Sequence, residues 1–132
     1  MKNYITVYRI IDSCLFIEVI AYQSGRTTIV CLSNESYERE ILNTSALMRQ
    51  HVTSVIVSIS QNTKCSEHFK YLLKRNIPLV FFDRVCDDIE ACKVVIDDYK
   101  SAFDTVTFLV NMGYKKIAHF AGPHGIGVYE KR

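Results

Sequence analysis

The stretch PLVFFDRVCDD, from Pro78 to Asp88, predicts a buried strand that ends abruptly in charge. Leu79–Phe82 is an unbroken run of apolar, β-prone residues, which is typical of a strand covered on both faces of a parallel sheet. Pro78 stops any helix from continuing into this run, because it lacks an N–H and restricts the residue before it. The run ends at Asp83 and Arg84, so we expect the carboxyl end of this strand to lie at the mouth of a ligand cleft.

The order helix, turn, strand occurs three times along the chain. It is carried by the segments ALMRQHVTSVIVSIS, YLLKRNIPLVFFDR and FLVNMGYKKIAHFAG, and each ends a helix in basic or amide residues before an apolar run. Repetition of this unit favours a parallel sheet with crossover helices. The sequence therefore predicts an α/β fold, in which a parallel sheet carries helices on both faces.

Hydrophobic spacing and capping residues divide the chain into individual elements. The expected helices span about 13–23, 35–50, 66–75 and 99–112. The expected strands span about 4–10, 27–32, 54–59, 79–82, 93–96 and 116–120. Asp98 is expected to cap the last helix, and Gly113 is expected to end it.

Composition limits the class of protein. The chain has 132 residues, 48% of them hydrophobic, which is enough to bury the core of one ordinary domain. A net charge of +2 is too small to indicate nucleic acid or a membrane surface as a partner. No apolar run has the form of a signal peptide or of a membrane span. The five cysteines form no CxxC pair and no zinc spacing, which favours a reducing cytoplasm.

Small, amide and charged residues follow the expected strands. They occupy positions 12–13, 33–34, 58–60, 83–84, 97–98 and 122–127. Ligands of open parallel sheets bind beyond the carboxyl ends of strands, and such a rim suits a polyhydroxy ligand. Asp83 offers acceptors for ligand hydroxyls, and Arg84 offers a rigid fork of donors. Spacing alone leaves open the alternative of a loop ion pair or turn cap.

Signatures of catalysis are weak, so we expect no catalytic residues, no cofactor and no metal. The segment AGPHGIGVYEKR lacks the GK[ST] of a P-loop and the third glycine of GxGxxG. No GxSxG elbow occurs, and His119 lies inside an apolar run, where a core histidine is the simpler interpretation. An enzyme on a flavodoxin-like sheet would therefore lack both a nucleophile–base set and a cofactor fingerprint.

Four segments together carry a more specific likeness. At SNESYERE, IPLVFFDRV, KVVIDDY and LVNMGYKKIAHFAGP the sequence resembles the effector-binding domain of bacterial repressors of the lac/gal repressor (LacI) family. The likeness runs over most of the chain and is strongest from about Ile29 to Pro123. The family domain is similar to periplasmic sugar-binding proteins. The resemblance implies two lobes with a sugar or nucleobase-like effector bound between them.

The resemblance also implies which residues bind the effector. They are Asp12, Ser13, Phe16, Asp83, Arg84 and Arg132. The first three match the cleft-lining segment after the first strand. The next two match the acidic effector-contacting position after the fourth strand and its common neighbour. The last matches an effector-binding arginine of the second lobe.

By the family layout, residues 1–97 form the N-terminal lobe and residues 98–132 an incomplete start of the second. The family's helix-turn-helix region is absent, so we expect no direct DNA contact from this chain. The apolar face of the last helix, with Phe103 and Val106, would need a partner surface, which favours a homo-oligomer. Because two lobes normally close on the ligand, we expect effector affinity to be weak or lost.

Two functions are compatible with the resemblance. The first is a truncated effector-binding domain of a LacI-family transcriptional regulator that recognises a sugar or related small molecule. The alternative is an interaction module that pairs with full-length family members and has lost effector binding. Neither function places the chain in a membrane.

Overall fold

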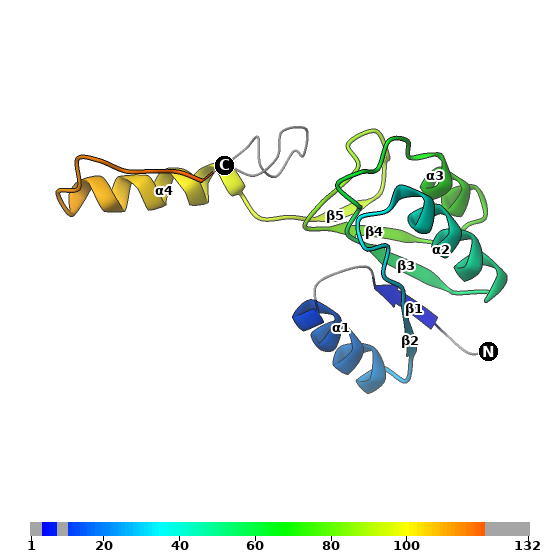
Figure 1. Cartoon of the computed structure of the whole chain (residues 1–132). Coiled ribbons are helices and arrows are strands. Elements are labelled where there is room, and N and C mark those ends of the chain that lie inside the picture. The colour runs from blue at the N-terminus through cyan, green and yellow to red at the C-terminus, as the bar shows by residue number, and fades with distance from the viewer. Residues whose placement is uncertain (1–3, 8–10, 121–132) are drawn as a thin grey trace. The chain divides into compact units, whose positions relative to one another are not determined.

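A parallel sheet forms the centre of the first of two compact units (Figure 1). The computed structural model describes residues 4–7 and 11–120, with side chains from Cys14 onward. The strands are β1 (Tyr4–Val7), β2 (Thr27–Val30), β3 (Ser54–Val57), β4 (Leu79–Phe82) and β5 (Cys92–Val94). Their spatial order is β2-β1-β3-β4-β5, and every neighbouring pair is parallel. The chain thus winds outward from β1 in both directions, as in doubly wound folds.

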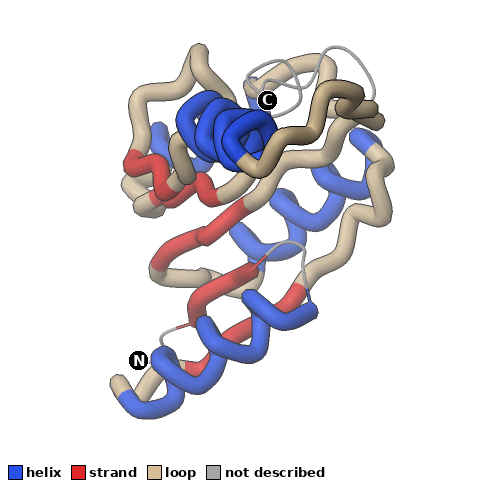
Figure 2. The backbone as a smooth tube through the Cα atoms, turned by 90° about the vertical axis from the view of Figure 1, so that its left-hand side faces the viewer, coloured by secondary structure: helices blue, strands red, loops and turns tan. Residues whose placement is uncertain are grey.

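Helices lie on both faces of this sheet (Figures 1 and 2). α1 (Ile11–Gln23) lies on one face, and α2 (Tyr37–Arg49) and α3 (Glu67–Lys74) lie on the other. Right-handed crossovers produce this division, because the chain moves one way from β1 to β2 and the opposite way from β2 to β4. The predicted α/β class, a parallel sheet with helices on both faces, is confirmed.

Local sequence signals set the helix ends. Ser36 caps α2, and its hydroxyl accepts a hydrogen bond from the backbone N–H of Arg39 at 3.2 Å. His51 (φ 52°) and Asn76 (φ 56°) follow the ends of α2 and α3 in the left-handed region. Both positions turn the chain into the next strand, as the helix, turn, strand pattern predicts.

The core lies between the sheet and the pair α2/α3. Val55 and Val57 of β3 and Phe81 of β4 are fully buried there, and alternate residues of the strands point to the other face. Phe69 of α3 meets Phe81 edge to face, with 5.6 Å between the ring centroids. Such an aromatic pair stabilises the fold by about 0.5–1.5 kcal/mol beyond the contribution of its buried apolar area. The strands are therefore anchored mainly from one side.

The opposite face of the sheet is less well covered. Ile56, Val80 and Phe82 are only half-buried, and Val94 of β5 is exposed. The helix on this face, α1, is itself apolar around its circumference. Its exposed apolar residues are Leu15, Phe16, Val19, Ile20 and Tyr22. A helix of this kind is normally covered on more than one side.

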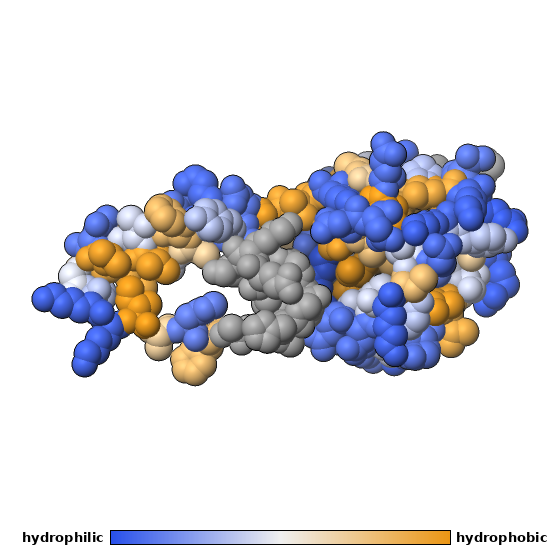
Figure 3. Space-filling view, turned by 90° about the horizontal axis from the view of Figure 1, so that it is seen from above, coloured by the Kyte–Doolittle hydropathy of each residue, from blue (hydrophilic) through white to orange (hydrophobic). Residues whose placement is uncertain are grey.

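The second unit runs from Val95 and contains α4 (Asp98–Asn111). The side chain of Asp97 caps this helix by accepting from Lys100 N at 2.8 Å, so the predicted cap, Asp98, is wrong by one residue. Gly113 ends the helix with φ 89°, as predicted. Apolar side chains of α4 lie at the surface of this unit (Figure 3). The lobe boundary at residues 97 and 98 stays a prediction.

The strand predicted at 116–120 does not form. Residues 114–120 have no regular secondary structure. A strand needs a hydrogen-bonding neighbour, and no other segment of the second unit's described residues supplies one. The apolar run Ile117–Phe120 therefore has the composition of a strand without the pairing. The bounds of β4 are as predicted, and the other bounds lie within two residues of the prediction, except that the predicted continuation of the first strand over 8–10 lies outside the described residues.

Candidate functional site

The carboxyl ends of β3 and β4 bring polar residues together, which is where ligands of doubly wound sheets bind. Ser58 directly follows β3, and Asp83 directly follows β4. The two strands are in parallel register, with Val57 opposite Phe81, so their carboxyl ends lie at the same end of the sheet. The Ser58 hydroxyl lies 3.4 Å from Oδ2 of Asp83.

Asp83 is held in an unusual backbone conformation. Its φ is 58°, which Asp tolerates better than most residues, and its N–H donates to the carbonyl of Val94 at 3.2 Å. The side chain is half-buried, and among the described residues its other oxygen, Oδ1, has no hydrogen-bond partner. The turn therefore presents a fixed carboxylate with unused acceptor capacity, which suits a ligand hydroxyl.

Arg84 is engaged within the protein. It is 8% exposed, and its Nη1 and Nη2 donate to the two oxygens of Glu35 at 3.0 and 3.1 Å. Nη1 also lies 3.3 Å from the carbonyl of Ile59. Glu35 in turn accepts from the backbone N–H of Gln61 at 2.8 Å. The guanidinium fork is thus matched to a carboxylate from the loop after β2.

A second buried carboxylate supports the loop after β3. Glu40 of α2 is fully buried, and its oxygens accept from Ser60 N at 2.7 Å and from Thr63 Oγ1 at 2.8 Å. His68 Nε2 of α3 lies 3.0 Å from the same carboxylate. A buried carboxylate is tolerated when it is paired and hydrogen-bonded in this way. Glu40 therefore joins two helices to the loop beside Ser58.

The sequence did not single out Glu35, Glu40 or His68. Glu40 stands at the start of a helical pattern, where an acidic residue is ordinary in the first turn. Its complete burial was not visible in the local pattern, because it depends on a loop some twenty positions further along the chain. The only signal of this burial in the sequence is the position of a charged residue between apolar residues of the helix.

The remaining predicted site residues are placed as follows. Asp12 and Ser13 lie in the first turn of α1, because this helix begins at Ile11 and not at about residue 13 as predicted. Their side chains and Arg132 lie outside the part of the chain that the structure describes. Phe16 is 74% exposed on α1. The structure therefore brings together Ser58 and Asp83, while the six predicted residues are not seen as one cluster.

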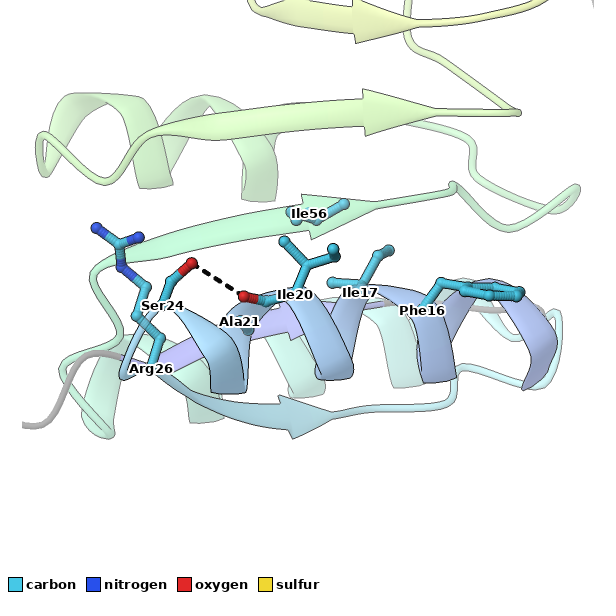
Figure 4. Close-up of a pocket in the computed structure, with 7 residues that line it drawn as sticks. All are labelled: Phe16, Ile17, Ile20, Ala21, Ser24, Arg26 and Ile56. Atoms are coloured by element: carbon cyan, nitrogen blue, oxygen red, sulfur yellow. Dashed lines mark hydrogen bonds between the residues drawn. The ribbon is translucent and has the colours of Figure 1, made fainter.

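Phe16 lines a hollow on the α1 face of the sheet (Figure 4). The hollow has a volume of about 330 Å³, and its lining residues are Phe16, Ile17, Ile20, Ala21, Ser24, Arg26 and Ile56. Ile56 points toward α1 from β3, and Phe16 extends toward the carboxyl end of the strands. The lining is mainly apolar and includes neither Ser58 nor Asp83. This hollow is therefore distinct from the strand-end site.

Charged residues beside α3 form a solvated network. Asp88 accepts a hydrogen bond from the Ser66 hydroxyl and pairs with Lys70 at 3.2 Å. The Ser66 hydrogen bond, and then the Lys70 one, lower the pKa of Asp88. No cluster of three or more potential metal ligands occurs within 4–7 and 11–120. We assign this network to the surface of the fold.

The cysteines are all unpaired. Cys86 is buried in the core cluster, and burial raises the pKa of its thiol to about 12. The thiol is therefore protonated and a poor nucleophile at neutral pH. Cys65 and Cys92 are exposed. None of the helices in the described ranges is long and apolar enough to cross a bilayer.

Comparison with known proteins defines the class. A periplasmic binding protein/LacI transcriptional regulator from Alkaliphilus metalliredigens, solved with D-xylulofuranose, superposes with a TM-score of 0.81 at 22% identity. The alignment covers 98% of this chain and 49% of that one. The transcription regulator CcpA of Lactococcus lactis gives a TM-score of 0.79 at 20% identity, covering 99% and 50%. The fold is thus that of the periplasmic-binding-protein-like class.

Sequence comparison finds a curated relative that is a repressor. The chain is 30% identical over 117 residues to the ribose operon repressor of Halalkalibacterium halodurans, over 88% of its own length. No protein-family profile matches the sequence. The chain is thus similar in sequence to a ribose operon repressor and similar in fold to LacI transcriptional regulators. It spans about a third of the length of the curated relative, 33%.

Proposed function

We propose that this chain senses a small polyhydroxy molecule, such as a sugar, for a LacI-type transcriptional regulator. The observation that carries the proposal is Asp83, a carboxylate fixed at the end of an interior strand, whose Oδ1 has no hydrogen-bond partner among the described residues and could accept from a ligand hydroxyl. Two findings from relatives agree with a sugar. One relative is a ribose operon repressor, and another was solved with D-xylulofuranose.

Binding fits the site better than catalysis does. The 3.4 Å hydrogen bond between Ser58 and Asp83 is long, and no third side chain among the described residues is hydrogen-bonded to the Asp83 carboxylate to complete a nucleophile–base set. The relatives compared above are transcriptional regulators and not enzymes. Unpaired cysteines and a regulatory role are consistent with the cytoplasm, where we place the protein.

The test is a titration of the 132-residue chain with D-ribose and D-xylulose, followed by ligand-detected NMR and calorimetry. We expect weak, saturable binding, with a dissociation constant above the micromolar range. Asp83→Asn should reduce the affinity about tenfold or more, since a charged acceptor is replaced by a neutral one. Asn also tolerates the left-handed backbone of this position, so the fold should be retained.

The matched control is Asp87→Asn, which removes an exposed carboxylate in the loop after the same strand. This control should bind like the wild type. Sugar binding that survives Asp83→Asn unchanged would remove Asp83 from the site. Absence of binding by the wild type to any sugar tested would contradict the sensing function.

We also propose that the chain self-associates, and the apolar circumference of α1 supports this proposal. Phe16 and Ile20 are 74% and 64% exposed on this helix, beside the half-buried face of the sheet. Exposed apolar surface of this kind favours a protein partner. Light scattering after size-exclusion chromatography should show a dimer that Ile20→Glu dissociates, whereas Gln23→Glu should not. A monomeric wild type would contradict this proposal.

A further inference from the structure

The loops after β2, β3 and β4 are tied together by one ion pair. Glu35 lies in the first loop, Gln61 in the second and Arg84 in the third. The Glu35 carboxylate accepts hydrogen bonds from the Arg84 guanidinium at 3.0 and 3.1 Å and from the Gln61 N–H at 2.8 Å. Three segments distant in sequence are therefore fixed by two side chains.

Backbone bonds run alongside the ion pair. The side-chain amide of Asn62 donates to the carbonyl of Glu35 at 2.7 Å, and the N–H of Ile59 donates to the carbonyl of Arg84 at 3.3 Å. The side chains of Arg84 and Glu35 are 9% and 20% exposed. Water therefore screens this pair far less than an ordinary surface pair.

We propose that Arg84 is a positioning residue: with Glu35 it clamps the three loops so that Asp83 and Ser58 keep their places at the strand ends. This inference rests on the proposed sensing function. Its consequence is a net negative charge at the rim: the positive charge of Arg84 is matched by Glu35, whereas no cation among the described residues pairs with the negative charge of Asp83. The site should therefore take a neutral polyol in preference to a sugar phosphate.

The clamp is tested first without any ligand, by site-resolved hydrogen exchange of the 132-residue chain. Glu35→Ala removes the acceptor of the Gln61 amide, and Arg84→Ala removes the group that holds this acceptor. Each should accelerate exchange of the Gln61 amide about tenfold, while core amides such as that of Val55 change little. The double variant should be no faster than Glu35→Ala alone, because both changes remove the same clamp.

Milder variants keep the test decisive if either alanine variant fails to fold. Glu35→Gln and Arg84→Lys each weaken the bidentate geometry and retain a long side chain. Both should accelerate exchange at Gln61 to a smaller extent. Unchanged exchange at Gln61 in Arg84→Ala and in Arg84→Lys would overturn the clamp.

The second arm compares D-ribose with D-ribose 5-phosphate as probes. The wild type should bind ribose about tenfold or more tightly than the phosphate, and Arg84→Ala and Glu35→Ala should weaken ribose binding to a similar extent. Glu35→Ala frees the guanidinium, so it should also narrow the preference against the phosphate. A loss of ribose binding in Arg84→Ala, with none in Glu35→Ala, would make Arg84 a ligand contact and overturn the proposal. If the wild type binds neither probe, the sensing function fails, and the exchange result still decides the clamp.

Discussion

Removal of the Glu40 carboxylate should be the most damaging polar substitution in the described part of the first unit. The carboxylate is fully buried and accepts from Ser60 N and Thr63 Oγ1, with His68 Nε2 at 3.0 Å. Glu40→Ala leaves these groups without their acceptor. Hydrogen bonds to charged groups contribute about 1.5–3 kcal/mol each, but they are not additive.

The expected loss of unfolding free energy is therefore about 3–5 kcal/mol, the range for breaking one side of a buried polar pair. Glu40→Gln keeps the shape and one acceptor oxygen, so we expect a loss of about 2 kcal/mol. Urea denaturation followed by circular dichroism measures both. For a chain of this size, the larger loss corresponds to a midpoint lower by roughly 2 M.

Arg39→Ala is the matched control on the same helix, because Arg39 is exposed and its backbone N–H still bonds to Ser36. Surface substitutions of this kind change stability by at most about 0.5 kcal/mol. An equal midpoint for Glu40→Ala and Arg39→Ala would refute the view that the buried carboxylate organises the loop after β3.

Three further outcomes are expected. Phe81→Ala should cost about 3–5 kcal/mol of unfolding free energy and Phe82→Ala clearly less, because only the first ring is fully buried; equal losses by urea denaturation would contradict the one-sided core. Iodoacetamide at pH 8 should modify Cys65 within minutes and leave Cys86 intact until the protein unfolds, as mass spectrometry would show. Because the pKa of Asp88 is lowered in the folded state, its carboxylate stabilises the fold above about pH 4, and this contribution is lost as pH falls through the folded pKa. Asp88→Asn should therefore reduce the loss of unfolding free energy on acidification, measured by urea denaturation at a series of pH values. An unchanged loss would contradict this role of Asp88.

The order of elements was predictable because each is encoded locally. The bounds of β4 were predicted correctly, since Pro78 and Asp83 flank a run of four apolar, β-prone residues, although the structure covers only one face of this strand well. The end of α4 at Gly113 is a similar case, because only the backbone freedom of glycine at φ 89° is needed to stop the helix. The α/β class followed from repetition of such local units.

Features that depend on distant partners were not predictable in the same way. The run Ile117–Phe120 has the composition of a strand, but pairing requires a neighbour that no local pattern specifies. Arg84 was expected to face a ligand, whereas the structure places its guanidinium on Glu35, forty-nine positions earlier in the chain. The predicted contact between Arg84 and an effector has not been tested, and the comparison of Arg84→Ala with Glu35→Ala decides it.

The left-handed backbone of Asp83 narrows the routes by which this rim can change over evolutionary time. Asn and Gly can adopt φ near 58°, but a β-branched residue there would strain the turn that the bond to Val94 closes. A descendant that changes its ligand is therefore expected to keep Asp, or to take Asn or Gly, at this position. Its new selectivity would have to arise from neighbours such as Ser58, whose backbone imposes no such restriction.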